Sequence, residues 1–153
     1  HSPTPSRVRM AVSSKGEGWL VTERDWDNVY FHVYVDNDTL ATREACLWYR
    51  WTSPESPGYR ADLYRHADAV RYTAQYGGAI PPDVIRPQRS PWLIYRVISG
   101  DNLSQVWLNE FQVADNKLLG LPPKGKIALY RSAKDGTVRF RGLVARELNG
   151  KGI

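Results

Sequence analysis

The feature that most constrains the fold is the strict alternation of residue types in the segment NVYFHVYVDN, residues 28–37. Successive side chains of an extended chain point to opposite sides, so a β-strand separates such a segment into two sets. The two sets here are Val29, Phe31, Val33 and Val35, and Tyr30, His32 and Tyr34. The sequence therefore predicts a strand with one apolar face and one polar aromatic face.

Several other segments share this composition. β-branched and aromatic residues dominate WLVT, WLIYRVIS, SQVWLNEFQV and IALYR, and turn residues interrupt the chain about every ten residues. Short strands separated by regular turns are typical of two stacked antiparallel sheets or of a closed barrel. We therefore expect a mainly β protein, an antiparallel β-sandwich or barrel. The proline-rich residues 77–91 are expected to form a long loop.

The middle of the chain supports two interpretations. The aromatic runs CLWYRWT and YRADLYR flank the loop SPESPG, which indicates a β-hairpin. However, apolar residues also recur at helical spacing before Gly77 and Gly78, at Leu63, Ala67, Val70 and Ala74. We expect a strand over residues 46–52 and one short helix over about residues 61–76.

Length and composition indicate one folded domain. The chain has 153 residues, of which 42% are hydrophobic and 24% are charged, as in a globular protein. The opening SPTPS resembles a linker, so we expect a linker-like segment over residues 1–6 and a single β-rich domain over residues 7–153. The apolar runs are too short for a transmembrane segment. A surface-displayed or extracytoplasmic location is favoured.

The positive charge is concentrated near the C-terminus, where residues 117–153 hold nine lysines and arginines against two acidic residues. The segment LYRSAKDGTVRFRG, residues 129–142, predicts a hairpin with a type I′ turn at Asp135-Gly136. In that register one face carries Tyr130, Lys134, Arg139 and Arg141. A face with so many cations either lies in solvent or binds a partner, and we predict that these four residues contribute to a binding surface.

This surface indicates a non-catalytic binding domain whose partner is a protein or an anionic polymer, either a glycan or a nucleic acid. A nucleic-acid-binding β-barrel is the first alternative, because such barrels combine exposed aromatic rings with basic strands. The sequence contains no RNP1-like run, GXXG loop or Cys/His finger, which weakens that alternative. A second candidate surface is aromatic and comprises Tyr30 and Tyr34 beside His32, or Trp48 and Trp51.

Catalytic and metal motifs are scarce. The chain has three histidines, one cysteine (Cys46) and no Gly-x-Ser-x-Gly motif, so we expect neither an enzyme nor a cofactor. One metal alternative remains open, because an N-terminal histidine can bind copper through its amino group and its imidazole. A copper-binding β-sandwich would use His1 together with His32 or His66.

Overall fold

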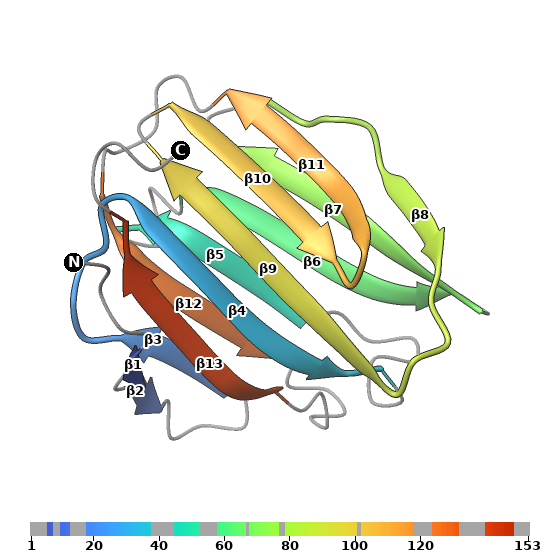
Figure 1. Ribbon diagram of the computed structural model, residues 1–153, viewed down its shortest axis with the longest axis horizontal. Coiled ribbons are helices and arrows are strands. Elements are labelled where there is room, and N and C mark those ends of the chain that lie inside the picture. The colour runs from blue at the N-terminus through green and yellow to red at the C-terminus, as the bar shows by residue number, and fades with distance from the viewer. Residues whose placement is uncertain are drawn as a thin grey trace.

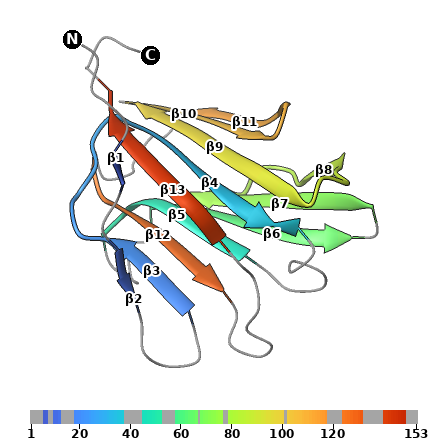
Figure 2. The ribbon, with the colours of Figure 1, turned by 60° about the horizontal axis from the view of Figure 1, so that its bottom comes forward.

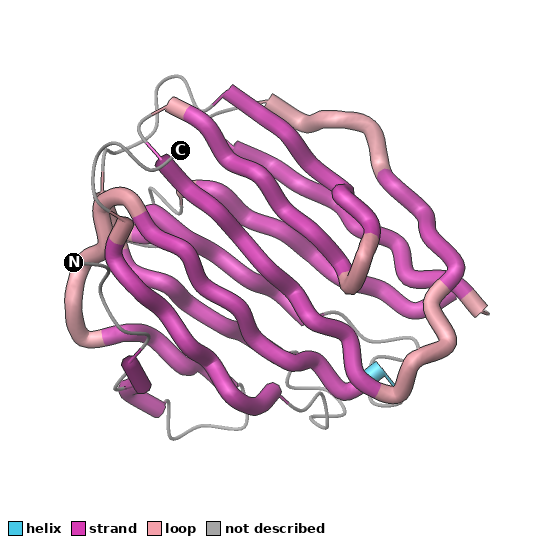
Figure 3. Tube along the Cα trace, in the orientation of Figure 1, coloured by secondary structure: helices cyan, strands magenta, loops and turns pink. Residues whose placement is uncertain are grey.

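The computed structural model describes residues 6–7, 10–12, 18–37, 45–52, 58–66, 68–76, 79–100, 102–117, 124–131 and 140–148. This part of the chain is built almost entirely from β-strands (Figure 3). The strands form two antiparallel sheets that lie one above the other (Figure 1 and Figure 2). The expected antiparallel β-sandwich is confirmed, and the expected strand over residues 46–52 is present. No helix among the described residues is long and apolar enough to cross a membrane.

The first sheet, called sheet A, has six strands. In spatial order they are β1 (Ser6–Arg7), β13 (Phe140–Glu147), β4 (Val29–Asp36), β9 (Trp92–Gly100), β10 (Leu103–Leu108) and β11 (Phe111–Lys117). Strands β9, β10 and β11 follow one another along the chain, whereas β4 pairs on its two sides with β13 and β9. Long-range pairing therefore builds the centre of this sheet.

The second sheet, called sheet B, has seven strands. In spatial order they are β2 (Met10–Val12), β3 (Gly18–Thr22), β12 (Lys126–Arg131), β5 (Ala45–Trp51), β6 (Tyr59–His66), β7 (Ala69–Tyr76) and β8 (Val84–Pro87). Strands β5 and β6 form the hairpin that the SPESPG loop indicates. Strand β8 lies within residues 77–91, so this segment is not entirely loop.

The hydrophobic core fills the space between the sheets. The four apolar residues of the alternating segment are buried in it, and Tyr30, His32 and Tyr34 are partly exposed on the opposite side of β4, as the sequence predicts. On β5 of sheet B, Leu47 and Tyr49 lie in this core, whereas Cys46 and Trp48 belong to a second buried cluster. Burial of one face of each sheet is the main stabilising contribution.

Four tyrosines, Tyr49, Tyr59, Tyr72 and Tyr95, lie inside the core, and the first three contact one another. Tyr49 and Tyr59 stack with ring centroids 4.5 Å apart, and the Tyr59 hydroxyl lies 2.6 Å from the Tyr72 hydroxyl. The Tyr49 hydroxyl is hydrogen-bonded to Ser104 across the sandwich. Burial raises the pKa of Tyr59 to about 12 and raises the pKa values of Tyr49, Tyr72 and Tyr95 well above 10.0.

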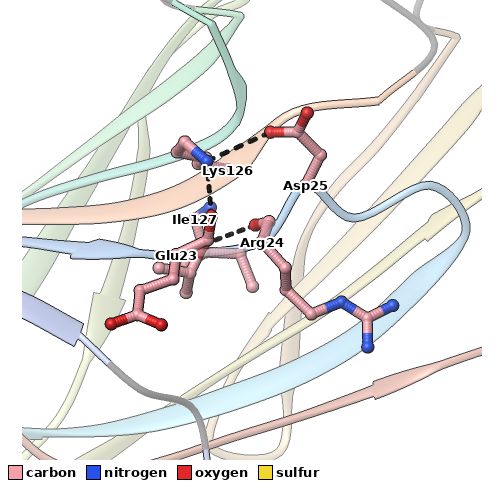
Figure 4. A network of polar contacts seen from close by, with 6 residues as sticks. Glu23, Arg24, Asp25, Lys126 and Ile127 are labelled. Atoms are coloured by element: carbon pink, nitrogen blue, oxygen red, sulfur yellow. Dashed lines mark hydrogen bonds and ion pairs between the residues drawn. The ribbon is translucent and has the colours of Figure 1, made fainter.

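The segment that connects β3 in sheet B with β4 in sheet A contacts the start of β12 (Figure 4). The Lys126 ammonium donates to the Glu23 carbonyl at 2.7 Å and lies 3.4 Å from the Asp25 carboxylate. The buried Thr22 hydroxyl accepts the Ile127 N–H at 3.0 Å. These contacts satisfy backbone groups where the chain leaves β3 and determine where β4 begins.

The helix expected over residues 61–76 is wrong, because these residues form the antiparallel pair β6 and β7. Every second residue of β7 is buried, including Val70, Tyr72 and Ala74. Val70 and Ala74 are four residues apart, so they satisfy helical spacing as well as the period of a strand. The burial of Tyr72 between them gives a period of two, which is that of a strand and not of a helix.

The hairpin expected over residues 129–142 is also wrong as a pairing. Strand β12 pairs with β3 and β5 in sheet B, whereas β13 pairs with β1 and β4 in sheet A. Both strands therefore have their two edges occupied by other partners. The expected turn at Asp135-Gly136 lies outside the described residues.

Candidate functional site

The outward side of sheet A carries a group of partly exposed aromatic and basic side chains. Tyr30, His32 and Tyr34 supply one row along β4, with ring centroids 5.7 Å apart for the first pair and 5.9 Å apart for the second. The strand pairing places further residues beside this row. These are Arg141 and Arg146 on β13, Trp92 and Arg96 on β9, and Trp107 on β10. We call this set the outer face of sheet A.

Each arginine of this face lies over an aromatic ring. The Arg141 guanidinium carbon lies 3.9 Å from the centroid of Trp92 and 5.4 Å from that of Tyr34. Arg146 lies 5.1 Å from Tyr30 in the same way. Such cation–π contacts stabilise the position of both groups by about 0.5–1 kcal/mol at exposed sites.

Arg96 connects β9 with the end of β10. Its guanidinium carbon lies 5.8 Å from the Trp107 ring centroid, and its Nη2 donates to the Asn109 carbonyl at 3.0 Å. Asn109 in turn accepts the Ile94 N–H through its side chain at 2.7 Å and has a positive φ of 52°. The face thus combines rings held at fixed positions with hydrogen-bond donors.

His32 is the titratable group at the centre of this face. Its Nδ1 lies 3.1 Å from the Tyr30 hydroxyl, and Arg96 is its register partner on β9. Burial lowers the pKa of His32 below 6.5, and the positive charge of Arg96 lowers it further. At neutral pH the imidazole is therefore uncharged and can accept or donate a proton.

Two β-bulges border the face. Between Arg141 and Val144 strand β13 contains one residue more than β4, and Gly142 has a positive φ of 63°. Between Val106 and Trp107 the register with β11 also shifts. Bulges change the direction of neighbouring side chains, and these two lie beside Arg141 and Trp107.

A buried amide network supports the end of the face near Trp92. The Asn37 side chain donates to the carbonyls of Gln88 and Ser90, at 3.2 and 3.0 Å. The Gln88 side chain accepts from Asn109 Nδ2 at 2.8 Å. These bonds hold the segment before β9 against β4 and β10, so the position of Trp92 is structurally determined.

The structure describes two of the four residues predicted to form a basic binding surface, Tyr130 and Arg141, and places them on different sheets. Arg141 is exposed on the outer face of sheet A, whereas Tyr130 lies on the outward side of sheet B, with its ring 6.0 Å from that of Trp48. Lys134 and Arg139 lie outside the described residues. The structure therefore does not bring Tyr130 and Arg141 together, and a binding role for each of the four stays a prediction.

The second predicted surface is present in one of its two forms. Tyr30, His32 and Tyr34 share one partly exposed face, and Trp92, Trp107 and three arginines extend it. Trp48 is only 6% exposed and packs with Cys46 and Ala128, so it does not form an open aromatic platform. Sequence alternation on β9 could have identified Trp92 and Arg96, but only the strand order places them beside β4.

No group of three or more metal-ligating side chains gathers among the described residues. His1 and the side chain of His66 lie outside these residues, so the copper site with His1 stays a prediction. The single cysteine, Cys46, is buried, and its sulfur lies 3.7 Å from an Arg60 nitrogen.

Solved structures share this fold at low sequence identity. A carbohydrate-binding module, CBM66, from Bacillus subtilis has a TM-score of 0.65 and 12% identity, and the alignment covers 95% of this chain and 96% of the module. The galectin LEC-6 from Caenorhabditis elegans has a TM-score of 0.57 and 8% identity, with 89% and 94% covered. A β-glucanase from Bacillus licheniformis has a TM-score of 0.55 and 12% identity, with 92% and 83% covered. The chain therefore has a β-sandwich fold that serves both binding proteins and enzymes.

The sequence also shows the family. Residues 7–145 match the family described as the 3-keto-alpha-glucoside-1,2-lyase-like domain, and the chain belongs to this family. No curated protein matches the sequence.

Proposed function

We propose that the chain binds carbohydrate through the outer face of sheet A. The observation that carries this proposal is the set of partly exposed rings on three adjacent strands, Tyr30, Tyr34, Trp92 and Trp107, each within 6 Å of an arginine guanidinium. A sugar ring has apolar C–H faces and polar hydroxyl edges. Flat aromatic rings suit the former, and guanidinium, imidazole and amide groups suit the latter.

The comparisons support this proposal. A carbohydrate-binding module and a galectin share the fold over most of their lengths, and the family is named for activity on a glucoside. Proteins of these kinds act on glycans, which favours an extracytoplasmic location for this chain as well. The basic charge at the C-terminus, which also favoured a protein or nucleic-acid partner, contributes Arg141 to the proposed glycan surface.

Replacement of Tyr34 by alanine tests the proposal. We expect the dissociation constant for the best oligosaccharide of a defined panel to rise tenfold or more, since each tenfold is about 1.4 kcal/mol and a central ring contributes at least that. Isothermal titration calorimetry measures the change. Tyr64→Ala is the matched control, because Tyr64 also lies under an arginine, with Arg71 at 4.9 Å, but on sheet B. Equal loss in both variants, or no loss in Tyr34→Ala, would contradict the proposal.

A second candidate function is catalysis by His32, which the family name and the geometry around this residue favour. A ketone at carbon 3 of a glucoside makes the proton at carbon 2 acidic. With Nδ1–H donating to the Tyr30 hydroxyl, Nε2 of the uncharged His32 is free to take that proton. Cleavage of the bond from carbon 1 to the glycosidic oxygen then gives an enone and an alcohol, which takes up a proton. Arg96 would stabilise the enolate charge.

Incubation of the chain with a 3-keto-α-glucoside tests this candidate by measuring release of the alcohol. We expect His32→Ala to lower the rate at least about a hundredfold, the usual contribution of a general base. Tyr64→Ala should leave the rate unchanged. If the unaltered chain releases no alcohol, catalysis is excluded and carbohydrate binding stands alone. If His32→Ala is fully active, His32 is not the general base.

A further inference from the structure

We propose that the ligand of the outer face of sheet A is an acidic oligosaccharide, a sugar chain that carries carboxylate or sulfate groups. This inference rests on the proposed carbohydrate-binding function and specifies the chemistry of its ligand. It is carried by the three arginines of this face, each of which lies over an aromatic ring.

Four arginines on other parts of the described surface each lie 3.1–3.8 Å from a carboxylate, namely Arg24, Arg60, Arg71 and Arg89. Arg96, Arg141 and Arg146 form no ion pair with any described residue. Arg86 on β8 also forms no ion pair with a described residue. The outer face is distinguished because its set brings three such arginines together and contains no carboxylate.

Arg141 has the best-defined geometry for an anion. Its guanidinium lies against the Trp92 ring, and a guanidinium stacked in this way keeps its N–H groups at the edge of its plane. That edge can donate two parallel hydrogen bonds to one carboxylate or sulfate group. The residue is exposed, and the bulge at Gly142 fixes the backbone next to it.

Arg146 and Arg96 extend the positive region along the face. The Arg146 Nε is buried without a hydrogen-bond partner among the described residues. A charged group that is withdrawn from water without an opposite charge is destabilising, and a bound anion offsets this cost. Burial, and after it the positive charge of Arg96, lower the pKa of His32 on the same face.

The spacing of the arginines indicates an oligosaccharide rather than a single sugar. Arg141 and Arg96 are two strands and two residues apart in the register, which corresponds to about 12 Å between their Cα atoms. Their guanidinium groups lie over different rings, Arg96 over Trp107 and Arg141 over Trp92. A chain of several sugar units that crosses β13, β4 and β9 can place one anionic group near each arginine and stack its intervening rings on Tyr34 and Trp92.

Binding of four probes tests the inference. They are a hexasaccharide of galacturonic acid, the methyl ester of the same hexasaccharide, a heparin hexasaccharide and a single-stranded DNA oligonucleotide. We expect at least one acidic hexasaccharide to bind tenfold or more tightly than the uncharged ester, with affinity that falls as salt is added. The two acidic probes distinguish carboxylate from sulfate as the recognised group.

Arg141→Gln should remove most of the preference for the acidic probe over the ester, because it removes the charge that lies against the Trp92 ring. Arg71→Gln is the matched control, because it removes the same charge from an arginine that lies over a tyrosine on sheet B. If the ester binds as tightly as the acidic probes, or if the DNA binds more tightly than both, the acidic ligand is wrong. If none of the sugars binds, the proposed function itself fails, so the two failures are distinguishable.

His32 provides an independent readout by nuclear magnetic resonance. The charged or titratable groups around it are Arg96 on β9, Arg141 and Arg146 on β13, and Tyr30 and Tyr34 on its own strand. A bound anion stabilises the imidazolium, so an acidic hexasaccharide should raise the pKa of His32 and bind more tightly as the pH falls through it. The methyl ester should cause no such rise, and an equal rise with both would overturn the inference.

Discussion

Replacement of Gly58 by alanine is expected to lower the free energy of unfolding by about 3–5 kcal/mol, since a strained backbone and an overpacked contact each cost a few kcal/mol. Gly58 has a positive φ of 73°, which a residue with a Cβ adopts unfavourably. That Cβ would lie 2.6 Å from the Tyr49 carbonyl oxygen and closer still to that of Arg50. Thermal unfolding followed by circular dichroism should show a fall in Tm of about 10 °C or more.

Gly142→Ala is the matched control for this prediction. Gly142 also has a positive φ, of 63°, but its added Cβ would meet only the Tyr34 ring, at 3.2 Å. A ring can move where a carbonyl cannot, so Gly142→Ala should cost about 1–2 kcal/mol, the strain of the left-handed backbone alone. Equal losses in the two variants would show that backbone strain, and not the contact with Arg50, determines the effect of Gly58→Ala.

The position of Gly58 matters because Arg50 connects the two sheets. Arg50 lies in a bulge of β5 with a positive φ of 55° and is 3% exposed. Its guanidinium donates to the Ser99 hydroxyl at 3.2 Å and to the Gly100 carbonyl, both at the end of β9. A shift of the Arg50 backbone would therefore move the strand that carries Trp92 and Arg96.

The fold could be predicted from the sequence where one local pattern has one explanation. The alternation in β4 is such a case, because neither a helix nor a loop separates four apolar residues from Tyr30, His32 and Tyr34. Over β6 and β7 the pattern failed, since Val70 and Ala74 fit both periods. There the pairing with neighbouring strands determines that the segments are strands, and one segment alone does not encode that pairing.

The candidate site could likewise be predicted only in those parts that depend on a local pattern. Arg141 and the Tyr30–His32–Tyr34 row were identified from sequence as parts of two separate surfaces. These residues share one face because β13 pairs with β4 and not with β12. No local feature of LYRSAKDGTVRFRG reveals this pairing. Trp92 and Trp107 were missed because they lie on β9 and β10. Only the pairing of β9 with β4, a strand distant in the chain, brings these residues beside Tyr30, His32 and Tyr34.

The tyrosines on the outer face of sheet A and the tyrosines in the core lie in different environments. On the outer face of sheet A, Tyr30 and Tyr34 keep their rings partly exposed beside cations, which suits a ligand surface. Inside, the hydroxyls of Tyr49, Tyr59 and Tyr72 are buried and bonded to one another or to Ser104. Polar groups buried in this way are favourable only while they stay uncharged and hydrogen-bonded. The core therefore has a specific sensitivity to high pH.

Alkaline pH is accordingly expected to unfold the protein cooperatively. The four core tyrosines have pKa values raised above 10.0 in the folded state, mainly by burial, so the folded state holds their protons more tightly than the unfolded state. Stability is complete below about pH 10 and is lost as the pH rises toward 12, the pKa of Tyr59. Each buried tyrosine contributes up to about 1.4 kcal/mol per pH unit, so the four together contribute up to about 5.6 kcal/mol per pH unit.

Phenolate absorbance and far-ultraviolet circular dichroism, recorded together between pH 9 and 12, measure this loss. The core phenolates should form in the same transition in which the β-sheet signal disappears, because ionisation requires exposure. Tyr72→Phe removes one of the four groups, so its stability should fall with pH less steeply, by about 1.4 kcal/mol per pH unit. If all the tyrosines ionise while the sheets remain intact, water reaches the core hydroxyls, and burial does not control their protonation.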